Sequence, residues 1–569
     1  MEDLVTVDEA CKWASDFLKK RITKSSIHYL LQYGKINKHA DAHKNLLVSI
    51  SELKAYYESS VISKQHDWKK QIGNDLNWHL SFDNLRELDT TKHVHRLHPY
   101  KGKYIPQLVE YFLDSHTDEF KKEIFFKPGD IVIDPFMGSG TTLVECGELG
   151  LHCIGIDISR FNCIIALVKV SRYDTKVVAE KLSGILDVVK NRIAQIGGHE
   201  LLKELKERVH VFNKLHFTGN DYKKKIASKE IDEDQVGKQK IEEFFADNGA
   251  IIEKLIKIEK ELKERKVETF LDAWFNTSIK EEFKIYLELI DNESDELFKN
   301  LLKIIASRTA RACRSTKHFD LATLKEPQFL PYYCWKHKKI CTPIESSFQR
   351  FKNYTMDTIR RIETYAKLRK DVELVPVNGD SRVIDVLKEV ERQNPRLSTI
   401  LSTRRIDGLF SSPPYVGQID YHEQHAYAYE MFAIPRQDDK EIGSLSKGES
   451  NKAREDYVIG ISAALRNVCK YIKDDGNIFL VANDKYDLYP AIARRSGLEI
   501  VNRFKRPVLN RTERDRQPYA EIIFHMRKKK DDDVKSEMCK KLIAKPASDE
   551  KKSGYKKVIP IKTTQSSLF

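Results

Sequence analysis

The sequence predicts an α/β fold built on a doubly wound, mostly parallel sheet, and three segments predict it. Residues 130–134 are an apolar run typical of a buried parallel strand. They lead into the loop Pro135-Phe-Met-Gly-Ser-Gly140 and then into a helical pattern over 141–149. Residues 152–157 and 405–411 repeat the buried-strand pattern. In sheets of this kind, ligands bind beyond the carboxyl ends of the strands.

The length and composition indicate a multidomain protein with a polyanionic partner. A chain of 569 residues is too long for one hydrophobic core, so we expect about two to four domains. The net charge of +13 and the pI near 9.0 favour a phosphate-rich partner, although a basic protein without one remains an open alternative. Nothing in the sequence has the length and apolarity of a membrane span, the first residues lack a secretory pattern, and nine scattered cysteines are typical of free thiols. We therefore expect a cytoplasmic protein.

Residues 1–60 are expected to form a small separate module. Thr6 is a candidate helix N-cap with Glu9 three residues later, and a second helical pattern over 23–33 stops at Gly34. Residues 35–38 and 45–50 could pair as a two-stranded wing before a closing helix at 51–57. This order resembles the excisionase-like winged helix-turn-helix, whose second helix enters the major groove. The resemblance points to Lys24, Ser25, His28 and Gln32 as DNA contacts; a helical cap that touches no DNA is the alternative.

The rest of the chain divides by composition. We expect a linker at 61–94, the cofactor half of the sheet at 95–172, and its catalytic half at 372–528. Between them, residues 173–371 form an insertion whose first part is helical and charged, as in 251–262, and whose second part is basic and aromatic. Residues 529–569 form a lysine-rich tail with little apolar content, which we expect to be disordered.

The loop after the first strand has the features of a nucleotide-type cofactor site. Gly138 and Gly140 let the backbone pass close to a ligand without an obstructing side chain. The second strand ends at Asp157, the position at which such sheets hold ribose hydroxyls. The loop lacks the G-x-G-x-x-G spacing of dinucleotide enzymes, and the string Asp134-Pro-Phe-Met-Gly-Ser-Gly-Thr-Thr142 is much more specific than a general glycine loop.

Ser412-Pro-Pro-Tyr415, which follows the strand 405–411, suits chemistry on a flat, amine-bearing base. An exocyclic amine on a base is a poor nucleophile because its lone pair is delocalised. A serine oxygen and a proline carbonyl can accept both of its N–H groups and direct the lone pair at a methyl donor, so positioning and electrostatics supply the acceleration. Tyr415 would stack on a base flipped out of the duplex. A merely structural proline-rich turn is the alternative.

Together the two motifs resemble the signatures of the S-adenosylmethionine-dependent DNA amino-methyltransferases, so the predicted sheet is a Rossmann-like methyltransferase core that ends in an antiparallel hairpin. The segment His98 to Gln107 resembles the one that closes over the methionine moiety, and Asp380 resembles the acceptor for the adenine amine. The resemblance implies S-adenosylmethionine as cofactor. It assigns its binding to Lys103, Tyr104, Asp134, Pro135, Phe136, Gly138, Ser139, Gly140, Thr141, Asp157, Ile158, Asp380 and Ser381, and catalysis to Ser412, Pro413, Pro414 and Tyr415.

The resemblance also implies the substrate. Serine before Pro-Pro-Tyr favours cytosine N4 in duplex DNA over adenine N6, and the residues after the motif resemble those of the cytosine-N4 enzymes. Asp420 and Tyr421 could line the base pocket or equally begin a packed helix. Adenine-N6 methylation, RNA amino-methylation and a catalytically inactive DNA-binding regulator remain alternatives. Any restriction endonuclease would be a separate protein. We expect the enzyme in a bacterial or archaeal cytoplasm, associated with the nucleoid.

From its charge, we expect the insertion to contribute to target recognition, although it comes earlier in the chain than the recognition region in one common arrangement of the family. Arg308, Arg311 and Arg314 fall on one helical face that suits phosphate contact. Cys334, His337 and Cys341 follow a loose metal-binding pattern, with Cys313 or His318 as a fourth ligand; we favour packing residues and expect no metal.

The chain ends in Gln565-Ser-Ser-Leu-Phe569 on the lysine-rich tail. This pentapeptide resembles the one that docks into the bacterial sliding clamp, through Gln565, Leu568 and Phe569, and a flexible tether would suit that contact. An inert chain end is the alternative.

Overall fold

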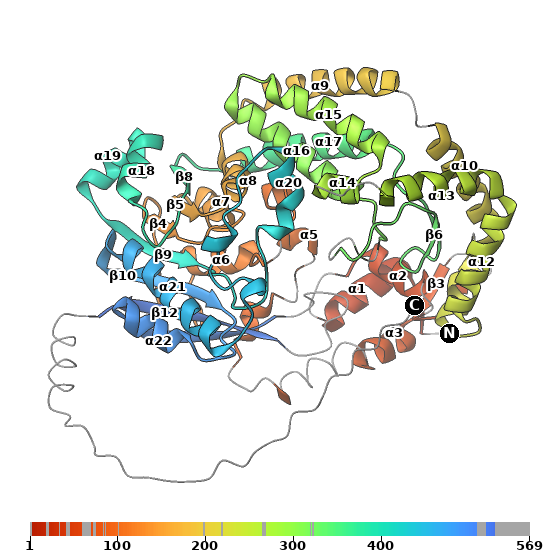
Figure 1. Ribbon diagram of the computed structural model, residues 1–569. Helices are drawn as coiled ribbons and strands as arrows, with labels where there is room; N and C mark the ends of the chain where they lie inside the picture. The colour runs from red at the N-terminus through yellow and green to blue at the C-terminus, as the bar shows by residue number, and fades with distance from the viewer. Residues whose placement is uncertain are drawn as a thin grey trace, which may run out of the picture. The chain divides into compact units, whose positions relative to one another are not determined.

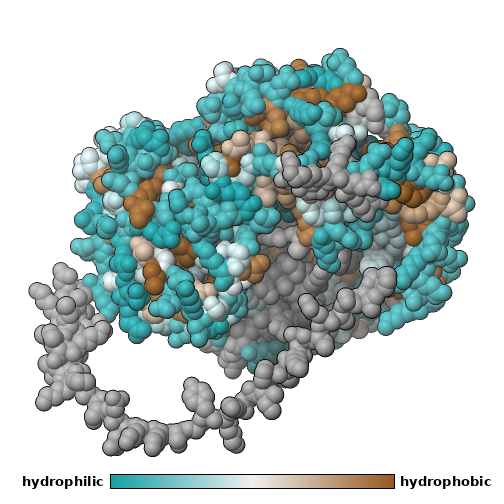
Figure 2. Space-filling view, in the orientation of Figure 1, coloured by the Kyte–Doolittle hydropathy of each residue, from teal (hydrophilic) through white to brown (hydrophobic). Residues whose placement is uncertain are grey.

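The computed structural model describes residues 3–18, 22–32, 35–40, 46–59, 70–71, 76–82, 85, 87–100, 102–196, 200–217, 220–264, 269–318, 320, 324–508 and 519–529. In this part of the chain no helix is long and apolar enough to cross a lipid bilayer. The face shown in Figure 2 is mostly hydrophilic, with apolar residues in small separate patches. Most of the apolar residues are therefore available for the buried cores.

A seven-stranded mixed sheet is the centre of the fold, and its strands lie in the order β11-β12-β10-β9-β4-β5-β8 (Figure 1). Its strands are β4 Ile131–Asp134, β5 His152–Asp157, β8 Leu374–Asn378, β9 Ile406–Ser411, β10 Ile472–Ala482, β11 Leu498–Pro507 and β12 Ala520–Lys528. Strands β8, β5, β4, β9 and β10 are parallel, whereas β12 pairs antiparallel with β10. The α/β prediction, with a mostly parallel sheet and antiparallel strands at its end, is confirmed at this level.

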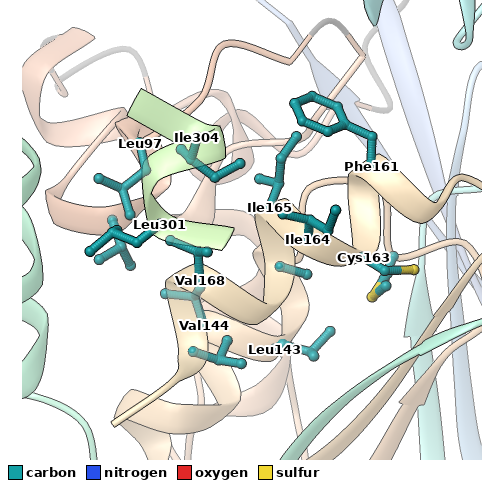
Figure 3. Close-up of a cluster of buried hydrophobic side chains, with 14 of the residues drawn as sticks. Leu97, Leu143, Val144, Phe161, Cys163, Ile164, Ile165, Val168, Leu301 and Ile304 are labelled. Carbon is teal, nitrogen blue, oxygen red and sulfur yellow. The ribbon is translucent and has the colours of Figure 1, made fainter. Parts of the chain in front are cut away.

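Alternate residues of the central strands face two separate cores, as a sheet covered on both faces requires. Ile131 and Ile133 of β4 pack into one core with helices α18, α19, α21 and α22. Val132, between them, packs into the other core with α6 to α9 and α15 to α17. Figure 3 shows part of this second core, where Val168 and Ile165 of α8 lie beside Leu301 and Ile304 of α16.

The helices that cover the sheet come from both halves of the predicted core and from the insertion. Those of the core are α6 Pro106–Leu113, α7 Thr141–Leu149, α8 Arg160–Val170, α18 Val386–Gln393, α19 Pro395–Thr403, α20 Ala426–Met431, α21 Asn451–Cys469 and α22 Tyr489–Ser496. Short helices are η2 Trp78–Ser81, α5 Glu87–Thr90, η3 His93–Arg96, η4 Glu423–His425, η5 Asp438–Lys440 and η6 Leu445–Lys447.

The chain between α8 and β8 is mostly helical, as its periodicity predicts. It contains α9 Thr175–Ile196, α10 Glu200–His216, α11 Asn220–Ala227, α12 Glu233–Asp247, α13 Gly249–Glu264, α14 Phe270–Trp274, α15 Thr277–Asp291, α16 Glu296–Cys313 and α17 Phe348–Ala366, with a hairpin of β6 Tyr332–Cys334 and β7 Lys339–Cys341. Helices α10, α12 and α13 share a small core that includes Ile340 of β7. Helices α9 and α15 to α17 instead pack into the core beside the sheet.

The N-terminal residues form a three-stranded sheet and three helices. The elements are β1 Leu4–Thr6, α1 Val7–Leu18, α2 Lys24–Gln32, β2 His39–Ala40, β3 Leu46–Ser49 and α3 Ile50–Tyr57, and the strand order is β1-β3-β2. The predicted cap is confirmed, because the backbone N–H of Thr6 donates to Glu9 at 2.9 Å and that of Glu9 donates to Thr6 Oγ1 at 3.3 Å. The first strand of the hairpin begins later than expected, and β1 was not predicted. Gly34 lies outside the described residues.

Candidate active site

A pocket with about 880 Å³ of empty space opens beyond the carboxyl ends of β4, β5, β8 and β9. The order of strands reverses between β4 and β9, and open α/β sheets bind their ligands at such a point. The predicted site residues that line the pocket are Lys103, Tyr104, Pro135, Phe136, Gly138, Ser139, Thr141, Asp157, Ile158, Asp380, Ser381, Ser412 and Pro414.

Two segments far apart in the sequence meet at the floor of this pocket. Strands β4 and β9 are neighbours, and Ser411 Oγ at the end of β9 donates to Asp134 Oδ1 at the end of β4 over 2.6 Å. Thr142 Oγ1 donates to the other carboxylate oxygen of Asp134 over 2.6 Å. Asp134 is fully buried, which raises its pKa, and it is not among the residues that line the pocket. Through these two hydrogen bonds, the buried carboxylate of Asp134 links the end of β9 to the start of α7 beneath the pocket.

The glycine loop after β4 has the close approaches that its sequence predicts. Gly138 has a φ of +49°, and a Cβ there would lie 3.1 Å from the ring of Tyr100. Gly140 has a φ of +78° and begins α7, and a Cβ there would lie 2.8 Å from Cβ of Ala166. Larger residues at either position would strain the backbone and crowd a neighbour. Gly140 does not line the pocket; its lack of a side chain lets the loop pack closely against Ala166 of α8.

Asp157 at the end of β5 points its carboxylate at the same loop. Its Oδ2 accepts the backbone N–H of Gly138 at 2.9 Å, and its Oδ1 accepts the N–H of Ser159 at 2.8 Å and the Asn162 side-chain amide at 3.1 Å. Burial nevertheless raises the pKa of Asp157 to about 7. The structure thus holds an acceptor for ligand hydroxyls in the pocket wall.

Asp380 and Ser381, which follow the end of β8, form another part of the pocket wall. Arg382 donates to both carboxylate oxygens of Asp380, at 2.9 Å and 2.6 Å. Burial by itself raises the pKa of Asp380, but its hydrogen bonds with Arg382 outweigh burial and hold the pKa below the ordinary value. Ser381 Oγ donates to the carbonyl of Pro135, which links this wall to the glycine loop.

The Ser-Pro-Pro-Tyr segment follows β9 directly. Ser412 Oγ donates to the carbonyl of Val481 at 3.1 Å, so the lone pairs of its oxygen remain able to accept. Ser412 and Pro414 line the pocket, whereas Pro413 and Tyr415 do not. The hydroxyl of Tyr415 donates to Glu521 at 3.0 Å, and burial raises the pKa of Tyr415 well above its ordinary value.

Lys103 and Tyr104, in the segment before β4, also line the pocket, although the sequence pattern that assigned them to the cofactor is less specific than the glycine loop. Lys103 Nζ donates to the carbonyl of His95 at 2.8 Å, and burial lowers the pKa of Lys103 to about 8. The hydroxyl of Tyr104 donates to Asp134 at 3.3 Å and contacts Thr142. Both side chains therefore connect the pocket to the buried base of the loop.

Several lining residues were missed by the sequence analysis. Tyr100 stacks on Tyr421, with ring centroids 6.0 Å apart, and both line the pocket. Lys440, Glu441 and Ile442 line it from a loop between α20 and α21 that has no recognisable motif. Tyr421 lines this pocket, and Asp420 lines a second one that also contains Tyr100.

The predicted arginine row is divided by the structure. Arg308 is buried in α16 and pairs with Asp357 at 2.7 Å. Arg308, Arg311 and Arg314 all line one pocket together with Arg96 and Arg350, and Arg311 and Arg314 also line a second. The side chain of Arg314 lies over the ring of Tyr427 and is itself largely buried, which lowers its pKa to about 10.

Among the predicted contacts of α2, the side chains of Lys24 and His28 are exposed. Lys24 forms an exposed ion pair with Asp8 at 2.8 Å. The side chains of Ser25 and Gln32 and the whole of the predicted clamp peptide lie outside the described part of the chain.

Comparison with known proteins agrees with this geometry. Residues 14–167 match a family model described as DNA methylase, of the N6/N4 type. Over 525 residues, covering 92% of this chain and 97% of the relative, the chain is 47% identical to the type II methyltransferase M.MjaII of Methanocaldococcus jannaschii. It is 34% identical over 112 residues to the type II methyltransferase M.MvaI of Kocuria varians, covering 20% of this chain and 23% of that protein. A tRNA (guanine(10)-N2)-dimethyltransferase of Methanocaldococcus jannaschii is 39% identical over 69 residues, which cover 10% of this chain and 20% of that enzyme.

Proposed function

The chain belongs to the N6/N4 family of DNA methylases, and on this basis we propose that it transfers a methyl group from S-adenosylmethionine to cytosine N4 in duplex DNA. One observation carries the proposal. Ser412 and Pro414 line the same pocket as the glycine loop, Asp157 and Asp380. A methyl donor held by the loop and an amine held by Ser412 would therefore share one cavity.

The residues present fit S-adenosylmethionine. Asp157 offers carboxylate oxygens to ribose hydroxyls, and Asp380 offers an acceptor to the adenine amine. Gly138 keeps free the space that a Cβ would fill beside Tyr100. Phe136, Lys103 and Tyr104 also line the pocket, and the family resemblance assigns them to the methionine moiety. When bound, this cofactor supplies an electrophilic methyl group on a sulfonium.

The chain's own residues would orient the amine. Because the Ser412 hydroxyl donates its hydrogen bond to the carbonyl of Val481, its oxygen can accept one amine N–H, and a carbonyl of the adjacent prolines can accept the other. This arrangement localises the nitrogen lone pair and requires no covalent intermediate with the base. Tyr415, held by Glu521, would stack on the flipped base.

We favour cytosine N4 over adenine N6 because serine begins the Pro-Pro-Tyr motif. An RNA substrate is the second candidate, since one relative is a tRNA methyltransferase, although that match covers only 10% of this chain. An inactive regulator is disfavoured by the intact pocket. The relation to type II methyltransferases supports DNA as the substrate, the cytoplasm as its location, and a separate cognate restriction endonuclease.

Two further regions are proposed to contact DNA: a winged helix-turn-helix module at 1–60, through Lys24, Ser25, His28 and Gln32, and the insertion at 173–371 with its arginines. Lys24 and His28 are exposed on α2, as such contacts require. Removal of residues 1–60 should weaken DNA binding while S-adenosylmethionine binding is retained; equal DNA affinity would refute the module's role.

We also propose that Gln565, Leu568 and Phe569, on the tail at 529–569, dock on a bacterial-type sliding clamp. Deletion of residues 565–569 should abolish binding to the clamp while methyl transfer to a short duplex is unchanged. Unchanged clamp affinity would show an inert chain end.

The experiment that tests the proposed function is transfer of a radiolabelled methyl group to duplex DNA and to RNA in parallel. We expect label in DNA, and labelling that is about 100-fold slower with the Ser412→Ala variant. Label in RNA alone, or in neither nucleic acid, would contradict the proposal.

A further inference from the structure

Four soft or imidazole side chains converge in the insertion, away from the proposed active site. They are His318, Cys334, His337 and Cys341, and one ligand atom of each lies within 4.8 Å of all the others. Cys334 Sγ lies 3.7 Å from His318 Nδ1 and 3.6 Å from His337 Nδ1, and His337 Nδ1 lies 3.4 Å from Cys341 Sγ. Of the two fourth ligands that the sequence left open, the fold thus brings His318 to the cluster.

These distances fit a tetrahedral metal site. Zinc bonds of about 2.3 Å to sulfur and about 2.0–2.1 Å to nitrogen place neighbouring S and N ligands of a tetrahedron about 3.5 Å apart. The three measured S–N separations lie on both sides of that value. Two cysteines and two histidines form one of the closed ligand sets that structural zinc prefers.

The local backbone builds the cluster from three places. Cys334 ends β6, Cys341 ends β7, and His337 lies in the turn between them. The backbone N–H groups of His337 and Lys338 both donate to the carbonyl of Cys334, at 3.0 Å and 2.7 Å, and close the turn. The turn also holds Lys338 at a φ of +53°.

His318 comes from the segment that follows α16. The hydroxyl of Tyr332 accepts its backbone N–H at 2.8 Å and lies 2.8 Å from its Nδ1. A nitrogen that binds zinc has no lone pair left for a hydrogen bond, so zinc at Nδ1 would displace the Tyr332 hydroxyl from this nitrogen, while that hydroxyl can still accept the backbone N–H of His318. The cysteines of the hairpin are free thiols rather than a disulfide.

A second cluster within the described residues does not have this character. His93, His95, Glu145 and Glu148 also converge, but Lys92 Nζ lies 3.0 Å from both carboxylates. A lysine ammonium already supplies the positive charge there, so this cluster is an internal ion-pair network. The Cys–His cluster contains no such cation.

We propose that His318, Cys334, His337 and Cys341 bind one zinc ion as a closed structural site. The ion ties the β6–β7 hairpin, whose Ile340 packs into the core shared with α10, α12 and α13, to the segment after α16. His318 and Tyr332 also line the pocket that contains Arg311 and Arg314. Zinc therefore fixes one wall of this basic pocket.

Metal analysis of the full chain tests the site directly. Protein purified without chelators should contain about one zinc per chain, and metal-free protein should bind cobalt(II) with the thiolate charge-transfer and tetrahedral ligand-field bands of a Cys2His2 site. A folded wild-type chain with less than about a tenth of an equivalent of zinc and no such cobalt spectrum would overturn the proposal.

Variants separate ligation from folding. The Cys334→Ser/Cys341→Ser double variant should lose zinc, while Cys11→Ser, a free cysteine in the N-terminal module, should keep it. His337→Ala should lose zinc and His337→Cys should retain it, because three cysteines and one histidine also form a closed set. Full zinc content in the double variant, or equal loss in His337→Ala and His337→Cys, would contradict the assignment.

The expected effect of zinc on DNA binding through the basic pocket rests on the proposed function. Loss of zinc should weaken DNA binding at least about tenfold while S-adenosylmethionine affinity stays within about twofold of wild type, since the ion lies outside the cofactor pocket. Unchanged DNA affinity in the zinc-free variant would show that zinc does not shape the basic pocket for DNA binding. Whether the four residues bind zinc is tested separately by the metal content.

Discussion

Two adjacent serines at the end of β9 have different environments. Ser411 is fully buried and donates to the carboxylate of Asp134, whereas Ser412 lines the pocket and donates to the carbonyl of Val481. Successive residues of a strand point to opposite sides, which separates the two hydroxyls. At the scale of single residues, we therefore assign positioning to Ser411 and amine recognition to Ser412.

Replacing Ser412 by alanine should reduce the rate of methyl transfer about 100-fold, because one acceptor for the amine is lost where charge develops. The melting temperature and S-adenosylmethionine affinity should stay near those of wild type. Single-turnover methylation measures the rate, and calorimetric titration measures cofactor binding. A rate within about threefold of wild type would show that Ser412 does not hold the amine.

Replacing Ser411 by alanine should instead lower the free energy of unfolding, by about 1–3 kcal/mol, because the buried Asp134 loses a donor. Denaturant titration of the two single variants compares them under identical conditions. If Ser412→Ala were the less stable of the pair, the proposed division between the serines would be wrong.

Asp157 makes cofactor binding depend on pH. Burial raises its pKa to about 7, and burial likewise raises the pKa of Glu441, on the same pocket, to about 7. As the pH falls through about 7, the carboxylate of Asp157 becomes protonated and can accept fewer hydroxyl donors. The affinity for S-adenosylmethionine should therefore decrease toward lower pH.

The Asp157→Asn variant separates the two carboxyl groups. It should bind S-adenosylmethionine more weakly at high pH and show a flatter pH dependence, with any remaining slope due to Glu441. Fluorescence titration across this pH range gives both curves. A variant curve parallel to that of wild type would assign the titration to another group.

At the scale of elements, the loops around the pocket differ in how far the sequence could predict them. The glycine loop and the Ser-Pro-Pro-Tyr turn follow strands directly, so both their motifs and their position at the sheet edge could be predicted from the sequence. The loop that carries Lys440 and Glu441 reaches the pocket through tertiary packing. Its sequence has no local signal for that position.

Helix α16 shows a second limit. Helical spacing correctly grouped its arginines, but spacing alone cannot distinguish a solvated face from a buried one. Arg308 lies against Tyr354 and pairs with Asp357, so it stabilises the packing of α16 on α17. Arg311 and Arg314 line two pockets, and Arg308 also lines one of them, but Asp357 holds the guanidinium of Arg308.

The Arg311→Gln/Arg314→Gln double variant should bind duplex DNA more weakly and should reduce the salt dependence of binding by about two units of logarithmic slope, because two phosphate contacts are lost. Arg308→Gln is the matched control. It should leave the salt slope unchanged and lower stability by about 1–3 kcal/mol, since it breaks a buried ion pair. DNA affinity measured over a salt series distinguishes them, and an unchanged slope in the double variant would remove these arginines from the DNA interface.

At the scale of the whole molecule, the central feature is that β4 and β9 are neighbours, although about 270 residues separate their motifs. The insertion between them packs its α9 and α15 to α17 helices into the core beside the sheet, so it does not interrupt the sheet. The motifs predicted this meeting because parallel strands of one sheet present their carboxyl ends at one edge. The convergence of His318 with the β6–β7 hairpin could not be predicted in the same way, since it depends on how α16 ends.

The account depends on an amine of cytosine reaching a methyl donor in the pocket between these strands. The most direct test is mass spectrometry of the nucleosides from duplex DNA that has been treated with this protein and S-adenosylmethionine carrying a trideuterated methyl group. We predict that the label appears on N4 of deoxycytidine, and that in the same short incubation the Ser412→Ala variant introduces about a hundredth as much. Label on adenine N6 or on C5 of cytosine, or unlabelled DNA, would contradict the account.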